Sequence, residues 1–216
     1  MGYGATLSLG CTIGAFFSSI PSLSLSGWVF GISLGIGSFI GPVHRIAASI
    51  DNKIELVSGA FSSTKDKSLL SGKNLFLDQD RIYGNFQEMF QKEKALSSDT
   101  RIDFVSIVTP NNSHYEIIME ALDSGFHVVC DKPITINSQQ AIEVEKKVLE
   151  TKKLFCLTHN YTGYPMVKEA KDMIYDNHLG NIRKIVVEYP QGWLATRIEG
   201  DTPCLLYTSP SPRDRG

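Results

Sequence analysis

Charge is missing from the beginning of this chain, since no lysine, arginine, aspartate or glutamate occurs from Met1 to Val43. The stretch is nevertheless interrupted by glycine, serine and Pro21, so it never offers the roughly 18 consecutive apolar residues of a membrane-spanning helix. It also lacks the basic segment that precedes the apolar core of a secretory signal. We therefore expect residues 1–26 to be a non-native or disordered leader, and we expect no membrane partner.

The rest of the chain also lacks features that would mark other classes of protein. The 21 basic and 23 acidic residues leave a net charge of -2 and no basic stripe, which excludes nucleic acid as a partner. The four cysteines form no C-x-x-C pair, and no cluster has the spacing of metal ligands. Cys130 and Cys156 lie within apolar runs, which is typical of reduced core cysteines, so we predict a cytoplasmic protein without a metal site.

The C-terminal residues do not resemble a folded segment. From Cys204 to Asp214 the chain matches a translated transposase sequencing adapter, so we expect residues 203–216 to be an artefactual tail. On this interpretation the native sequence stops near Thr202 and the natural protein is longer. The alternative is an ordinary tail rich in proline and serine.

Apolar runs alternate with helical patterns over most of the chain. The predicted strands cover residues 28–34, 54–60, 102–108, 126–130 and 154–157, and the predicted helices cover residues 39–50, 114–124 and 137–150. Strands that alternate with helices indicate a parallel sheet with a helix in each crossover. We predict an α/β fold, a Rossmann-type doubly wound parallel sheet over residues 27–160.

The pattern changes after this region. A helix to about Asn177 and a stop at Gly180 are followed by residues 182–189, which we interpret as a strongly alternating strand with one solvated face. We interpret residues 161–202 as the start of a truncated α+β domain for substrate binding and oligomerisation.

The run Phe126–Pro133 ends abruptly in an acid, a lysine and a proline. Open α/β sheets bind their ligands beyond the carboxyl ends of the strands, where Lys132 would lie. A lysine that merely leaves the sheet for solvent is the plainer alternative.

A glycine-rich stretch lies between the first predicted strand and the first predicted helix. Its G-x-G-x-x-x-G spacing would let the backbone approach a pyrophosphate at the helix N-terminus, although a glycine-rich turn without a ligand has the same appearance. The predicted cofactor contacts in this stretch are Gly35, Gly37, Ser38, Phe39 and Ile40.

The second predicted strand lacks the acid that often follows it in this fold. Ser62 and Ser63, with Lys65, would contact a ribose 2'-hydroxyl or accommodate a 2'-phosphate, which leaves NAD and NADP both open as cofactors. The two serines would equally serve to begin and cap the next helix.

A Thr-Pro-Asn turn follows the strand predicted over 102–108. Thr109 and Asn111 would bind the nicotinamide ribose, although an ordinary turn with a helix cap would have a similar sequence. His44 and His114 lie early in their predicted helices, and we interpret both as structural rather than catalytic residues. The predicted cofactor contacts from these two strand ends are Thr109, Pro110, Asn111, His114, Asp131 and Lys132.

Taken in order, these motifs resemble those of the Gfo/Idh/MocA family of NAD(P)-dependent oxidoreductases. The resemblance covers about residues 28–199 and rests on Gly41-x-x-His44, Thr109-Pro110-Asn111-x-x-His114 and Asp131-Lys132-Pro133. It implies an N-terminal Rossmann domain for the nicotinamide cofactor and a C-terminal α/β domain for sugars, inositols or related polyols. It also implies that the full-length protein is a homo-oligomer.

The chain departs from the family pattern at three places. Asp131 stands where family members usually have glutamate, and the frequent arginine after the last Rossmann strand is missing from 161–165. The family's acid/base histidine and a nearby aspartate belong to a motif that should lie beyond Thr202. Asn160 and Tyr161 are weaker candidates for substrate contact.

The resemblance implies hydride transfer from a secondary hydroxyl to NAD(P)+. Lys132 would hydrogen-bond the reacting hydroxyl as a desolvated cation, and Pro133 would fix its direction. The alternatives are an NAD-dependent glycosidase of the same fold and a non-catalytic, cofactor-binding regulatory protein. The fragment itself is expected to have little or no activity.

Overall fold

The computed structural model describes residues 27–32 and 40–188. The chain divides into two compact units, residues 1–168 and 169–216, and each is treated by itself. The predicted leader over 1–26, the predicted tail over 203–216 and the glycine-rich stretch from Gly35 to Phe39 lie outside the described residues.

The first unit contains a parallel sheet of five strands in the order β2-β1-β3-β4-β5. The strands are β1 (Gly27–Ile32), β2 (Ile54–Ala60), β3 (Phe104–Ile107), β4 (His127–Cys130) and β5 (Phe155–Leu157). A single parallel bridge between Gly59 and Ile82 extends the order by one position beyond β2. With that bridge as the third strand, the order is the doubly wound 3-2-1-4-5-6 of dinucleotide-binding folds, which confirms the predicted fold class.

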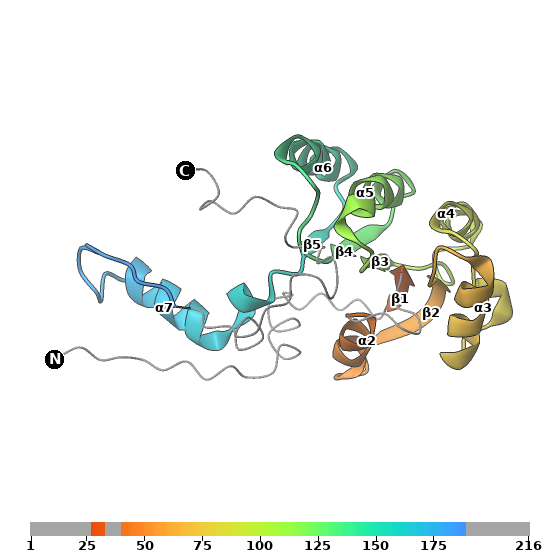
Figure 1. Ribbon diagram of the computed structural model, residues 1–216, viewed down its shortest axis with the longest axis horizontal. Coiled ribbons are helices and arrows are strands. Elements are labelled where there is room, and N and C mark those ends of the chain that lie inside the picture. Colours follow the sequence, from red (N-terminus) through yellow and green to blue (C-terminus); the bar gives the residue numbers. More distant parts are fainter. Residues whose placement is uncertain (1–26, 33–39, 189–216) are drawn as a thin grey trace, which may run out of the picture. The chain divides into compact units, whose positions relative to one another are not determined.

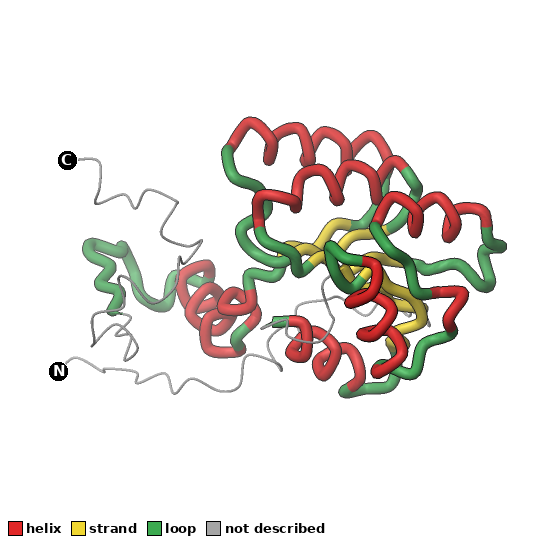
Figure 2. The backbone as a smooth tube through the Cα atoms, turned by 45° about the vertical axis from the view of Figure 1, so that its right-hand side comes forward, coloured by secondary structure: helices red, strands yellow, loops and turns green. Residues whose placement is uncertain are grey.

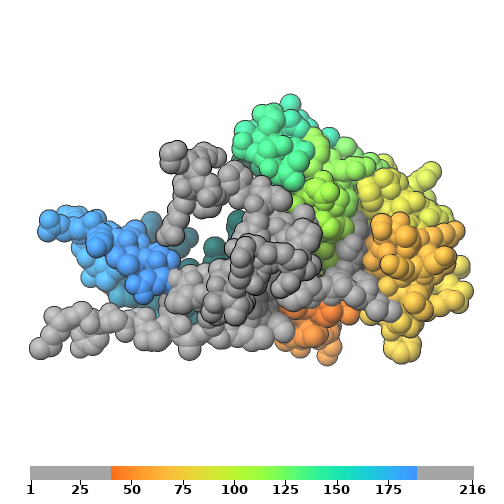
Figure 3. All heavy atoms as spheres, in the orientation of Figure 1, coloured from red at the N-terminus to blue at the C-terminus, as the bar shows by residue number. Residues whose placement is uncertain are grey.

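Helices cover both faces of this sheet, as the ribbon and the tube both show (Figures 1 and 2). These helices are α2 (Gly41–Ser49), α3 (Lys65–Asn74), α4 (Phe86–Ala95), α5 (His114–Asp123) and α6 (Ser138–Thr151). A further helix, α7 (Pro165–Tyr175), runs across the division between the two units and has no buried residue. Three short 3-10 helices are η1 (Gln79–Arg81), η2 (Asn111–Ser113) and η3 (Asn160–Gly163). The helices α5 and α6 pack against each other and form one green surface in Figure 3.

Two hydrophobic clusters hold these layers together. The larger joins β3 and β4 to α4, α5 and α6, and includes the stacked rings of Phe90 and Phe126, whose centroids are 5.8 Å apart. The smaller cluster contains Phe61, Ile82 and Val108. Because strands that lie between two layers of helices carry apolar side chains on both faces, the largely apolar runs of the sequence identified these strands correctly.

Local capping explains where two of the helices begin. Asn85 accepts a hydrogen bond from the backbone N–H of Glu88 at 2.8 Å, and Asn137 accepts one from Gln140 at 2.9 Å. Each bond satisfies a backbone donor that the first turn of a helix leaves without an intrahelical partner. The sequence predicts the helix that starts at Asn137, which the structure confirms, but its pattern does not indicate α4.

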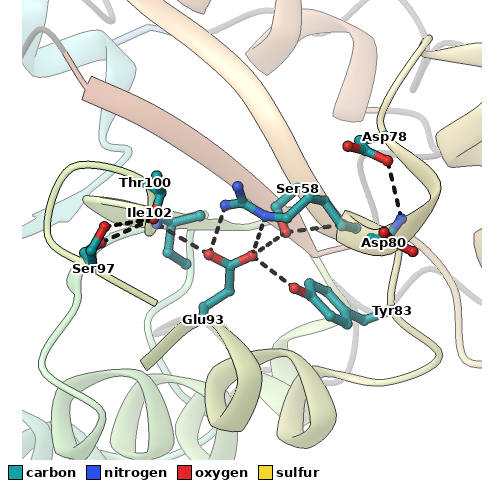
Figure 4. A network of polar contacts seen from close by, with 9 residues as sticks. Ser58, Asp78, Asp80, Tyr83, Glu93, Ser97, Thr100 and Ile102 are labelled. Carbon is teal, nitrogen blue, oxygen red and sulfur yellow. Dashed lines mark hydrogen bonds and ion pairs between the residues drawn. The ribbon is translucent and has the colours of Figure 1, made fainter. Parts of the chain in front are cut away.

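A buried carboxylate ties the outer side of the sheet to α4 (Figure 4). Glu93 is fully buried and accepts hydrogen bonds from Ser58 and Tyr83 at 3.0 Å and from the backbone N–H of Ile102 at 3.2 Å. Burial, together with the Glu93 charge, raises the pKa of Tyr83. The network therefore joins β2, the Ile82 segment and the start of β3 through one side chain.

One predicted strand is wrong. Residues 182–188, the part of the predicted 182–189 strand that the structure describes, have no regular secondary structure. Alternation of apolar and polar residues specifies the two faces of a strand, but a strand also needs a hydrogen-bonded neighbour. Residues 182–188 have no strand neighbour within the described part of the chain.

Candidate active site

The carboxyl ends of β3, β4 and β5 lie next to one another in the sheet. Ile107 pairs with Cys130, and Cys130 pairs with Leu157, so the segments that follow these strands leave the same edge. The order of the sheet reverses between β1 and β3, and such a switch point is where doubly wound folds bind nucleotides.

Lys132 leaves this edge directly after β4. Its side chain is exposed and makes no hydrogen bond or ion pair within the described part of the chain. The backbone N–H of Asp131 donates to the carbonyl oxygen of Ile107 at 2.9 Å, which continues the pairing of β3 and β4 by one residue. The peptide bond between Lys132 and Pro133 is cis.

The Asp131 carboxylate is held by the neighbouring strand end. The Thr158 hydroxyl donates to Oδ1 of Asp131 at 2.5 Å, and the Thr158 backbone N–H donates to the carbonyl oxygen of Cys130 at 2.9 Å. Thr158 itself is buried. Asp131 therefore has a fixed carboxylate immediately before the free lysine.

On the first turn of α2, His44 is buried against the sheet. Its Nδ1 lies 3.1 Å from the hydroxyl oxygen of Ser106 in β3. Burial lowers the pKa of His44, and the negative charge of Asp131 partly opposes that shift. His44 thus fixes the helix that follows the glycine-rich stretch, in agreement with a structural role.

The turn after β3 is braced by Ser113. Its hydroxyl lies 2.7 Å from the Thr109 hydroxyl and 2.8 Å from the Pro110 carbonyl oxygen, to which its backbone N–H also donates at 3.0 Å. The half-buried side-chain amide of Asn111 makes no hydrogen bond within the described residues. The turn is therefore rigid and presents a polar side chain without a protein partner.

Almost fully buried at 1% exposure, His114 begins α5. Its Nδ1 lies 2.8 Å from the Pro133 carbonyl oxygen, and its Nε2 lies 2.8 Å from the Thr109 carbonyl oxygen. The ring connects the segments that follow β3 and β4.

The end of β2 lies on the other side of β1. Ser62 accepts a weak hydrogen bond from the backbone N–H of Thr64 at 3.4 Å, and Ser63 is exposed. The helix α3 begins after Thr64, so neither serine is its N-cap residue, contrary to the alternative raised from the sequence. No acid stands between Phe61 and Lys65.

The two candidate substrate contacts follow β5 in η3. Asn160 is half-buried, and Tyr161 is 48% exposed and packs edge-to-face on Tyr164 with ring centroids 5.6 Å apart. Two residues that fix the site, Thr158 at Asp131 and Ser106 at His44, are not among those predicted from the sequence. The available signal was a hydroxyl residue within or directly after an apolar run.

The described residues fit a nicotinamide dinucleotide. The switch point, the free amide of Asn111 and the free amine of Lys132 all belong to one edge of the sheet. Ile40 is half-buried and immediately precedes α2. Of the cofactor contacts predicted in the glycine-rich stretch, it is the one that lies within the described residues. Together these features define a dinucleotide-binding protein of the Rossmann class.

Comparison with known families gives the same class and a family. A sequence model described as "Oxidoreductase family, NAD-binding Rossmann fold" matches residues 34–172. The chain belongs to this Gfo/Idh/MocA oxidoreductase family. A second model, described as sulphur transport, matches residues 1–40.

Known proteins support the family assignment. The chain is 36% identical to the uncharacterized oxidoreductase YfiI of Bacillus subtilis (strain 168) over 74% of this chain and 40% of the relative. It superimposes on an oxidoreductase from Sinorhizobium meliloti with a TM-score of 0.66 and 47% identity, over 71% of this chain and 42% of that one. An inositol dehydrogenase homolog from Azotobacter vinelandii, complexed with NADH and myo-inositol, gives a TM-score of 0.67 and 34% identity, over 72% of this chain and 40% of that one.

The chain spans about 40% of the length of these relatives. Among the described residues, no helix is long and apolar enough to cross a membrane.

Proposed function

We propose that this chain is the cofactor-binding part of a longer dehydrogenase, which transfers hydride from a secondary hydroxyl of a sugar, inositol or related polyol to NAD+ or NADP+. The observation that supports this most strongly is the exposed Lys132 amine without a protein partner, at the nucleotide-binding edge. The inositol dehydrogenase homolog complexed with myo-inositol supports the substrate class.

In this proposal, the bound cofactor supplies the hydride acceptor. Thr109 and Asn111, on the braced turn after β3, bind the nicotinamide ribose. Lys132 donates a hydrogen bond to the substrate hydroxyl and stabilises the negative charge that develops on its oxygen as hydride leaves. The Lys132 side chain is exposed in the described part of the chain. Removal of water from its amine therefore requires bound substrate and the remaining part of the protein.

The same proposal includes the organisation of the chain. We assign residues 27–160 to the dinucleotide-binding domain and residues 161–202 to the start of a substrate and oligomerisation domain. We assign residues 1–26 to a non-native or disordered leader and residues 203–216 to an artefactual tail. We further propose that the full-length protein is a homo-oligomer with a cytoplasmic location, and the free thiols of Cys130 and Cys156 agree with that location.

The direct test is Lys132→Met in the complete protein. We expect kcat/KM for polyol oxidation to fall by about 100- to 1000-fold, as when one charge-stabilising donor is removed, with NADH binding retained. Lys94→Met is the matched control, because Lys94 is exposed on α4 and away from the carboxyl-end edge. Full turnover by Lys132→Met would refute the catalytic assignment.

Product analysis separates this proposal from its alternatives. A dehydrogenase accumulates NADH or NADPH from a free polyol, whereas a glycosidase that recycles its cofactor releases free sugar without net reduction. A regulatory protein binds the cofactor without turning over either substrate.

A further inference from the structure

The His114 ring connects the two turns that carry the proposed chemistry. It lies 2.8 Å from the carbonyl oxygen of Thr109, where the turn after β3 begins, and 2.8 Å from that of Pro133, the residue after Lys132. We propose that His114 is a positioning residue that holds Lys132 in register with the turn that binds the nicotinamide ribose. This inference rests on the proposed function.

Burial leaves His114 no surface for direct contact with a ligand, in contrast to the cofactor contact expected for this residue from the sequence. The residue is 1% exposed, and both polar atoms of its ring face protein carbonyl oxygens, which can only accept. A ring nitrogen turned toward the cofactor would leave one of these contacts unmade in a buried site, which is unfavourable. His114 therefore acts through the backbone of other residues.

The backbone on both sides of Lys132 is fixed, while its side chain is not. Before it, the Asp131 N–H donates to the Ile107 carbonyl oxygen at 2.9 Å, and the Asp131 carboxylate accepts from Thr158 at 2.5 Å. After it, the Pro133 carbonyl oxygen lies against the His114 ring. Because the Lys132 amine has no protein partner among the described residues, the direction of its side chain depends on this backbone.

The Nε2 atom of His114 contacts the turn that binds the cofactor in this proposal. The Thr109 carbonyl oxygen belongs to the same turn as Asn111, which Ser113 braces from within. The ring thus sets a fixed spacing between an amine that contacts substrate and a turn that contacts cofactor. Hydride transfer depends steeply on such spacing, since a displacement of about 1 Å in an active site can reduce the rate by about 100-fold.

His114→Gln in the complete protein tests this inference. The glutamine amide has a single nitrogen and an acceptor oxygen at its end, so it cannot present a nitrogen to both carbonyl oxygens as the imidazole ring does, and we expect kcat to fall at least tenfold. KM and the Kd for NADH should change less than threefold, because no ligand contact is removed. The matched control is His127→Gln: His127 accepts from the Leu154 backbone N–H at 2.9 Å at the amino end of β4, away from the catalytic edge.

The outcomes are distinct. An unchanged kcat, a loss confined to KM or Kd, or an equal loss in His127→Gln would each overturn the positioning role. Wild-type protein without dehydrogenase turnover would instead overturn the proposed function. If His114→Gln does not fold, NMR of 15N-histidine and 13C-carbonyl labelled wild-type protein decides. A coupling across a hydrogen bond from a His114 ring nitrogen to the Pro133 or Thr109 carbonyl supports the contact, and a rapidly exchanging ring without one refutes it.

Discussion

Arg81 donates from both Nε and Nη2 to the Glu93 carboxylate, each at 2.7 Å, although the Glu93 side chain is fully buried. The two residues lie twelve positions apart, one in η1 and the other in α4. Paired charge of this kind is stable only because the remaining carboxylate lone pairs also have donors. The pair therefore attaches the segment around Ile82 to α4, in addition to the backbone bridge between Ile82 and Gly59 of the sheet.

Breaking this pair should destabilise the fold strongly. Glu93→Gln leaves the partly buried Arg81 guanidinium without its counter-charge, and we expect the free energy of unfolding of the chain to fall by about 3–5 kcal/mol. Urea denaturation measures the change. Glu88→Gln on the same helix is the control, because its ion pair with Lys92 is solvent-exposed and should contribute less than about 1 kcal/mol. Similar losses for the two variants would contradict the prediction.

The end of β2 should tolerate no side chain at Gly59. A Cβ there would lie 1.9–2.4 Å from three atoms of the buried Phe61 ring. We expect Gly59→Ala to cost about 1–3 kcal/mol of stability through overpacking, as seen by a lower melting temperature. In Gly84→Ala the new Cβ would make only ordinary contacts from 3.4 Å outward, so its melting temperature should stay close to that of the wild type.

Stability should fall below neutral pH through two histidines. Burial is the largest cause that lowers the pKa of both His44 and His127, so the unfolded chain binds protons at a higher pH than the folded chain does. The stabilisation is complete above the unfolded histidine pKa of about 6.5 and is lost as pH falls through that value.

Urea unfolding at about pH 7.5 and about pH 5.5 measures the effect, which spans the histidine range. A double variant, His44→Gln with His127→Gln, should show a smaller loss between the two pH values than the wild type. An equal loss would show that other groups cause it.

An acid placed after β2 should discriminate against a 2'-phosphate. In Ser62→Asp, the new carboxylate would repel that phosphate, and we expect the ratio of kcat/KM for NADP+ to kcat/KM for NAD+ to fall about tenfold, equivalent to about 1.4 kcal/mol. Ser98→Asp, at an exposed position after α4, provides the same charge elsewhere and should leave the ratio unchanged. No change in Ser62→Asp would place the adenosine ribose away from this residue.

The sequence predicted the sheet because its information is local. Runs such as 126–130 are largely apolar, and the residues after them, Asp131 and Lys132, stand out as polar at a strand end. Because the strands are parallel, the chain direction places the residues that follow each strand at the same edge of the sheet. The Lys132 position could therefore be predicted without any tertiary contact.

Other features depend on partners that the sequence does not reveal. Glu93 has the appearance of a solvated acid on an amphipathic helix, and only the fold brings Arg81 and Tyr83 to it. His114 could be interpreted as structural, but its partners are backbone carbonyl oxygens, which every residue possesses. The strand predicted over 182–189 failed over 182–188 for a related reason, since alternation specifies faces but supplies no neighbour.

The single bridge at Ile82 has a consequence for association between chains. An exposed strand edge with a row of unpaired backbone groups is a template for another strand, and very short edges remove that template. Here one lateral edge of the described sheet ends in one bridge between Gly59 and Ile82, and the other ends in the three-residue strand β5. Neither edge offers a run long enough for a foreign strand to join, so the sheet is protected against edge-to-edge aggregation.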